Sequence, residues 1–171
     1  MTKLSPINST DDLAGSILGE LCEILLSFEA AARMGDADAI HEMRVTVRRL
    51  RVAVANFRCC VNRESRSSLK DRLTQLAEHL GAVRDLDVLM DELAKALSSC
   101  PATDQRYLRA MIKRLRDRRR RRVHRLIRLL DSRPLETLPA EIVRQADQSG
   151  TRTVETPLHE YEFERLQEVH G

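Results

Sequence analysis

The stretch that decides the fold is residues 41–57, HEMRVTVRRLRVAVANF. Apolar side chains that recur every three or four residues share one side of an α-helix. Here that side consists of Met43, Val47, Leu50, Val54 and Phe57. A neighbouring side holds the His–Arg ladder, spaced three, four and three residues apart: His41, Arg44, Arg48 and Arg51. The segment is therefore predicted to be an amphipathic helix with a row of potential cations beside its buried side.

The His–Arg ladder needs negative charge from outside its own helix. Like charges four residues apart repel each other, and Glu42 is the only acid among residues 41–58. Arginine holds phosphate oxygens with two parallel hydrogen bonds, and only four of the 29 basic residues are lysine. The pattern favours a phosphate-rich ligand. A solvated charged face, with an arginine bias from a GC-rich genome, is the alternative explanation.

Two stretches resemble the signatures of one known family. Residues 41–57 resemble the opening signature of the CHAD family, the conserved-histidine α-helical domain. LGAVRDLDVL at residues 80–89 resembles the next signature, in the same order and at a similar spacing. The resemblance covers roughly residues 10–135 and implies an all-helical module that binds inorganic polyphosphate through a basic surface. It also implies that Arg84 contacts the polyanion, although a local pair with Asp85 or Asp87 would explain this arginine equally well.

This chain resembles a half-length member of that family. Full-length members resemble two related helical bundles, each with its own His–Arg helix, and this chain shows one. Residues 158–165 align with a second histidine motif, but Glu162 stands where arginine is expected. Alternatively, residues 166–171 resemble the segment that precedes the LG turn of the second half. Under either alignment the second basic helix is missing, so a closed basic channel would require a homodimer.

The expected fold is all-α, an antiparallel bundle of about six helices. Glycine and proline are scarce among the 171 residues, and aromatic residues make up 3%, so aliphatic side chains must fill the core. Gly35 and Asp36 are expected to end the first helix and cap the second, Gly81 to bend or stop the third, and Asp85 to cap the fourth. Helices are predicted at about residues 10–34, 37–60, 64–82, 85–97, 102–131 and 134–147.

Two domains are predicted: a bundle at residues 1–135 and a short helical extension at 136–171, a reduced second half. Within the extension, residues 148–157 are expected to form a linker and 158–170 an amphipathic segment.

Charge is segregated along the chain, although the net charge is only +3. Residues 41–66 carry 7 basic and 2 acidic residues, and residues 106–128 carry 12 and 1, whereas both ends of the chain are acidic. This arrangement implies an anionic partner, unless the acidic ends cover the basic helices. Arg119 and Arg122 fall on the leucine-rich side of the 102–131 helix. An unpaired buried arginine is costly, so both must pair with acids, extend to water or line a hydrated anion site.

Catalysis, metals and cofactors are not expected. No phosphate-binding glycine motif, nucleophile elbow or HExxH motif is present. The cysteines form no CxxC pair and are expected to be buried or inert thiols in a reducing cytoplasm: Cys22, Cys59, Cys60 and Cys100. No apolar stretch is long enough for a signal peptide or membrane span, so a cytoplasmic location is expected.

The sequence therefore predicts non-catalytic binding of inorganic polyphosphate, and the resemblance suggests a location at polyphosphate granules. The residues expected to bind polyphosphate are His41, Arg44, Arg48, Arg51, Arg84, Arg119, Arg122 and, more weakly, Lys70. One alternative is a nucleic-acid-binding protein that uses the 102–131 helix, although low aromatic content argues against base stacking. The other is a scaffold without a ligand, in which the acidic ends neutralise the basic helices.

Overall fold

The computed structural model describes residues 10–58 and 63–139, and every regular element in these ranges is an α-helix. The helices are α1 (Thr10–Ser27), α2 (Glu29–Arg33), α3 (Ala37–Asn56), α4 (Arg63–Ser99) and α5 (Ala102–Ser132). Residues 137–139 are again helical. The prediction of an all-α bundle is confirmed. Within the described ranges, no helix combines the length and the apolar character that a membrane span requires.

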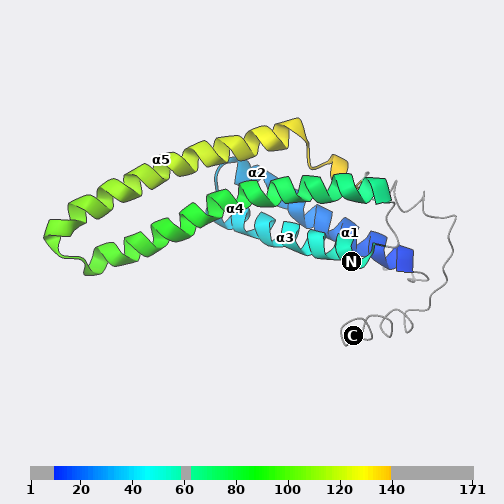
Figure 1. Ribbon diagram of the computed structural model, residues 1–171, viewed down its shortest axis with the longest axis horizontal. Helices are drawn as coiled ribbons and strands as arrows, with labels where there is room; N and C mark the ends of the chain where they lie inside the picture. Colours follow the sequence, from blue (N-terminus) through cyan, green and yellow to red (C-terminus); the bar gives the residue numbers. More distant parts are fainter. Residues whose placement is uncertain (1–9, 59–62, 140–171) are drawn as a thin grey trace, which may run out of the picture.

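The two longest helices, α4 and α5, form an antiparallel hairpin that runs along the length of the described structure (Figure 1). The two helices are joined at Cys100 and Pro101. The shorter helices α1, α2 and α3 lie against one half of this hairpin, and the other half extends beyond them (Figure 1). The main core cluster has no described member between Val83 and Val123. The far half of the hairpin is therefore a two-helix arm outside the main core.

The turn between α2 and α3 follows the sequence prediction. Gly35 has a φ of 82°, the left-handed conformation that glycine adopts without a steric penalty. The backbone N–H of Gly35 donates to Ala32 O (2.9 Å) and that of Asp36 to Ala31 O (3.1 Å), which closes α2 in a Schellman motif. The Asp36 carboxylate then accepts from the backbone N–H of Ala39 (2.7 Å) and caps α3. Two adjacent residues thus end one helix and begin the next.

The predicted break near Gly81 is wrong. One continuous helix, α4, spans the region in which two helices were expected. Gly81 is buried between the core residues Leu80 and Val83. A glycine inside a helix costs about 1 kcal/mol, and each fully buried leucine or valine contributes about 1.5–3 kcal/mol, so core packing keeps the helix intact. Asp85 is consequently an exposed residue inside α4 and does not cap a helix.

Arg119 ties three parts of the bundle together. Its guanidinium donates from Nε to one carboxylate oxygen of Asp87 and from Nη2 to the other, at 3.3 Å. Nη2 also donates to the carbonyl of Gly35 (2.9 Å). Only 6% of the Asp87 side chain and 17% of the Arg119 side chain are exposed. Of the roles predicted for this arginine, the structure shows the pair with an acid, at the junction of α4, α5 and the α2–α3 turn.

The chain that follows α5 packs back onto the bundle. Leu135 and Leu138 are buried members of the core cluster. The buried guanidinium of Arg72 in α4 donates to the carbonyls of Arg133 and Pro134 and to Thr137 Oγ1. The described beginning of the predicted extension therefore shares the core of the bundle, and the domain division at residue 135 stays a prediction. Predictions for the rest of the 134–147 helix, the linker, residues 158–170, Cys59 and Cys60 fall outside the described residues.

The ion pair between Asp87 and Arg119 yields a stability prediction. The Asp87→Ala substitution leaves a largely buried guanidinium without its counter-charge, so the free energy of unfolding should fall by about 3 kcal/mol in urea denaturation. The double substitution Asp87→Leu with Arg119→Met removes both charges and should recover most of that loss, because an apolar pair of similar volume needs no counter-charge. A loss below about 0.5 kcal/mol for Asp87→Ala would contradict a buried, energetically coupled pair.

Candidate functional site

Two contacts fix how α3 and α4 lie against each other. The guanidinium of Arg44 on α3 lies directly over Gly81 on α4, where a Cβ atom would collide with Nη1 of Arg44. Near the other end of the pair, Nη1 of Arg66 on α4 donates to the carbonyl of Arg58, just after α3 (3.0 Å). The helices are therefore antiparallel, with residue 44 level with residue 81 and residue 58 level with residue 66. This register places His41 level with Arg84, and Lys70 level with Val54 and Ala55, about one turn from Arg51.

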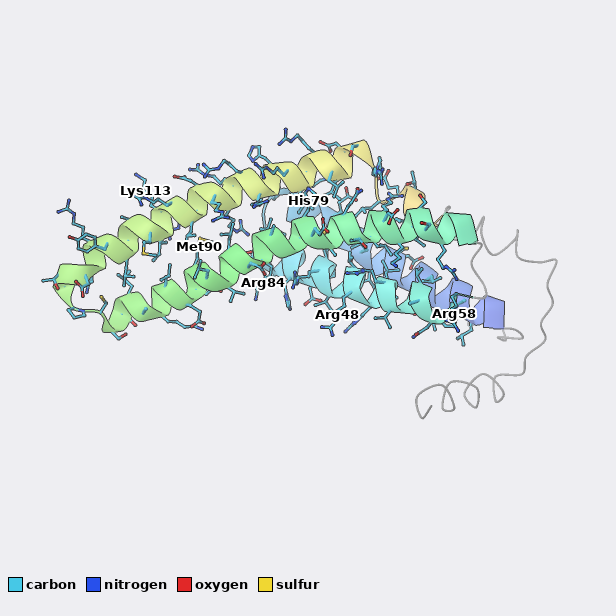
Figure 2. All side chains as sticks on the ribbon, in the orientation of Figure 1. Arg48, Arg58, His79, Arg84, Met90 and Lys113 are labelled. Atoms are coloured by element: carbon cyan, nitrogen blue, oxygen red, sulfur yellow. The ribbon has the colours of Figure 1, made fainter. Side chains whose placement is uncertain are left out.

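Cations from both helices consequently share one side of the molecule. On α4, Arg66 and Arg84 are 18 residues apart, about five full turns, so they point the same way. Figure 2 shows Arg84, Arg48 and Arg58 along the α3–α4 side, whereas Lys113 lies on α5. We refer to this surface as the α3–α4 basic face, and it consists of His41, Arg44, Arg48, Arg51, Arg58, Arg66, Lys70 and Arg84.

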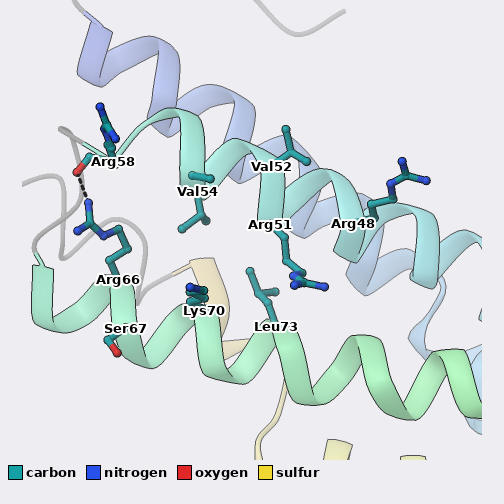
Figure 3. A pocket seen from close by; sticks show the side chains of 10 residues that line it. Arg48, Arg51, Val52, Val54, Arg58, Arg66, Ser67, Lys70 and Leu73 are labelled. Atoms are coloured by element: carbon teal, nitrogen blue, oxygen red, sulfur yellow. Dashed lines mark hydrogen bonds between the residues drawn. The ribbon is translucent and has the colours of Figure 1, made fainter. Parts of the chain in front are cut away.

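The α3–α4 basic face contains a hollow of about 720 Å³ between the second half of α3 and the first half of α4. Figure 3 shows Arg51 reaching from α3 toward α4, and Arg48 on the outer side of α3. Aliphatic side chains form part of the wall, and five cationic side chains surround it. Its described lining, which includes no carboxylate, is Arg48, Arg51, Val52, Val54, Ala55, Arg58, Arg66, Ser67, Lys70 and Leu73.

The described carboxylates that form ion pairs lie away from the α3–α4 basic face. Glu29 and Asp131 pair with Arg33, Glu92 pairs with Lys95, and Asp87 pairs with Arg119. Asp117, the acid within the arginine run of α5, accepts from Arg120, and this hydrogen bond lowers the pKa of Asp117 below its ordinary value. Among the described residues, no cation of the α3–α4 basic face has a carboxylate partner. The mutual repulsion of these cations is therefore not balanced from within the described protein.

His41 is the first residue of the His–Arg ladder, in the second turn of α3. The side chain is half-buried, and its Nδ1 atom is buried without a hydrogen-bond partner among the described residues. The same ranges contain no cluster of three histidine, cysteine or acidic side chains arranged to hold a metal ion. His41 is thus a half-buried polar group at one end of the α3–α4 basic face.

The structure brings together six of the eight predicted site residues: His41, Arg44, Arg48, Arg51, Lys70 and Arg84. The other two, Arg119 and Arg122, lie on α5, which packs against α4 on the side away from α3 (Figure 1). Arg119 is occupied by Asp87, and Arg122 is half-buried. The described site is therefore a face of two helices, and α5 contributes neither predicted arginine to it.

Sequence reasoning missed Arg58 and Arg66. Arg58 is seven residues after Arg51 and continues the His–Arg ladder by two turns. Arg66 falls in line with Arg84 only if α4 is continuous, and the predicted stop at Gly81 concealed that alignment. Only the omission of Arg66 follows from an expected helix end, because Arg58 lies within the predicted 37–60 helix and its spacing from Arg51 was visible in the sequence.

Comparisons with known proteins agree with the helical signatures. The family model of the CHAD domain matches residues 16–170, well past the end of the resemblance at residue 135. The uncharacterized proteins Rv2226 and MT2285, from two strains of Mycobacterium tuberculosis, are each 33% identical over 82 residues. These 82 residues are 48% of this chain but only 16% of each relative. No solved structure matches the chain.

The contact of Arg44 with Gly81 can be tested with alanine. Gly81→Ala should gain helix propensity, up to about 1 kcal/mol in the free energy of unfolding, but must displace the flexible end of Arg44. Gly19→Ala in α1 is the matched control, because nothing lies within 4 Å of a Cβ at that position. Urea denaturation should show a smaller gain for Gly81→Ala in the native background than in an Arg44→Ala background. Equal gains in both backgrounds would show that Arg44 does not occupy this position.

Proposed function

This chain belongs to the CHAD domain family, and we propose that it binds inorganic polyphosphate along the α3–α4 basic face, without catalysing a reaction. One observation carries the proposal. Eight cationic or titratable side chains from α3, α4 and Arg58, just after α3, share one side, and none has a carboxylate partner among the described residues. The association of the family with polyphosphate-related proteins supports this choice of anion.

The shape of the α3–α4 basic face suits a linear anion. His41 and Arg58 are 17 residues apart, which corresponds to about 25 Å along a helix. Repeating phosphates can follow such a row, and each guanidinium can hold two oxygens of one phosphate. A small anion would engage only a few of these cations, so longer chains should bind more tightly. We propose that chain length, rather than a particular end group, determines affinity.

Each part of the α3–α4 basic face has a distinct proposed role. Arg51 and Lys70 would hold phosphates in the hollow, where the aliphatic wall reduces access of water to the ion pairs. Arg44 would bind from its position over Gly81, with little freedom to move toward α4. At the end of the row, a ring N–H of His41 would donate to a phosphate oxygen. Residence at polyphosphate granules would follow from the same binding.

Reversal of two charges in the His–Arg ladder tests the proposed function. Arg44→Glu with Arg48→Glu replaces two attractive contacts with repulsion, so affinity for polyphosphate should fall by about 100-fold or more. The measurement is fluorescence anisotropy with labelled long-chain polyphosphate at about 0.15 M salt. Arg109→Glu with Arg116→Glu is the control, because it changes the net charge equally at exposed positions of α5. Circular dichroism checks that all three proteins remain helical.

The control variant should retain most of the affinity. An equal loss in both double variants would show that binding follows net charge and has no defined face. A folded wild-type protein that does not bind polyphosphate would refute the proposed function. Competition with unlabelled anions identifies the ligand class. If duplex DNA or RNA displaces the labelled polyphosphate at a lower phosphate concentration than unlabelled polyphosphate does, the ligand is nucleic acid instead.

The proposed function also predicts how affinity for polyphosphate depends on ionic strength. Binding should weaken linearly in a plot of log affinity against log salt, because each phosphate contact releases condensed counterions. By analogy with single-stranded nucleic acid, Arg44→Gln with Arg48→Gln should reduce the slope by about 0.7 for each lost contact. Titrations at several salt concentrations measure both slopes. An unchanged slope would mean that these two arginines do not touch the polyanion.

A further inference from the structure

The α4–α5 hairpin has a free side that the proposed function does not use. The seam is the line along which α4 and α5 face each other, and it contains Leu86 and Met90 of α4 and Ile112 and Arg119 of α5. Leu86 and Ile112 are buried there, and Arg119 reaches Asp87 across the seam. On antiparallel helices, the residues that precede seam residues by one position point to the same side of the hairpin. By contrast, a residue that follows a seam residue by one position points to the opposite side, which on α4 is the side of α3. Leu80 follows His79 and Arg84 follows Val83, so both are on the side of α3.

We call the side formed by residues one position before the seam residues the outer hairpin face. Its members include Asp85, Leu89 and Glu92 on α4, and Tyr107, Met111 and Arg118 on α5. All six are exposed. Three are large and apolar, with exposed fractions of 45% for Leu89, 49% for Met111 and 70% for Tyr107. They gather on the arm outside the main core, where the described residues provide nothing that covers them.

Charge on the outer hairpin face is divided between the two helices. The α4 side carries the exposed acids Glu78, Asp85 and Glu92, and the α5 side carries the exposed arginines Arg114, Arg118 and Arg125. Among the described residues, neither Asp85 nor Arg118 has an ion-pair partner. A polyanion would meet the acids of α4 as well as the arginines of α5. The face instead suits a partner with the opposite arrangement, an arginine row beside an acidic row.

We propose that the outer hairpin face binds a second copy of this chain. A two-fold axis parallel to the hairpin places α4 of one protomer against α5 of its partner. Acids then face arginines along the whole interface, and the apolar end of one arm covers the apolar end of the other. Neighbouring helices are antiparallel throughout, so the two hairpins form a four-helix bundle that buries the exposed Leu89 and Met111. The α3–α4 basic faces stay open on the two outer sides of the dimer.

Charge reversal provides a sharp test, because this symmetry pairs Asp85 with the partner's Arg118 twice. Sedimentation velocity of the full chain, without polyphosphate, should show a concentration-dependent species of twice 19.6 kDa. Asp85→Arg alone and Arg118→Asp alone should each weaken self-association by about tenfold or more, since each creates two like-charge pairs. An equimolar mixture of the two variants should associate nearly as well as wild type, because both pairs are complementary again in the mixed dimer.

Arg116→Asp is the matched control. Arg116 is exposed, two residues from Arg118 on the same helix, and follows a seam residue, so it lies on the other side of the hairpin. Its reversal should leave self-association unchanged, and circular dichroism should show all variants to be helical. A wild-type chain that stays monomeric up to millimolar concentration, a mixture that does not associate, or an equal loss in the control would overturn the proposal. Loss of polyphosphate binding by Arg118→Asp would also overturn it, because this face would then be an anion site.

Discussion

The continuity of α4 through Gly81 is the constraint on which the rest of the structure depends. Leu76, Leu80, Val83 and Leu86 are buried on both sides of the glycine and keep the helix in one piece. The unbroken helix brings Arg66, Lys70 and Arg84 into phase on the side of α3. It also positions Asp87 for Arg119 and gives the hairpin its long arm. A stop at Gly81 would remove all three features, so one glycine with a buried neighbourhood determines both the site and the free arm.

The core explains how the protein tolerates a row of like charges. A like-charge pair four residues apart costs roughly 0.2–0.5 kcal/mol in a helix. The buried side of the same helix includes Met43, Val47 and Leu50, and each fully buried side chain of this size contributes about 1.5–3 kcal/mol. Burial therefore exceeds repulsion, and α3 folds without a counter-ion. Under the proposed function, an anion would relieve the repulsion that remains in the folded state, so the ladder would serve binding rather than stability.

The sequence was sufficient for the parts of the fold that depend on local patterns. Helical spacing predicted α3 and α5 nearly to their ends, and Gly35 with Asp36 marked the turn between α2 and α3 correctly. The break predicted at Gly81 was wrong because the preference of glycine against helix is weak. The core packing that overrides this preference is a tertiary effect, which local patterns do not reveal. The partner of Arg119 was also hidden, since Asp87 is 32 residues away along the chain and several other acids had suitable positions. The His–Arg ladder was predictable from periodicity, whereas the hollow beside it required the register of two helices.

The structure separates three uses of arginine that the composition alone combines. Arg72 and Arg119 are largely shielded from solvent and donate to carbonyl, hydroxyl or carboxylate oxygens, so they hold helices and connections together. The arginines of α3 are exposed and have no acidic partner among the described residues, so their charge would be available to a ligand. The exposed arginines of the outer hairpin face adjoin acids on α4, so a partner at that face would have to match both signs. A net charge of +3 conceals these differences, because function depends on which charges already have a partner in the fold.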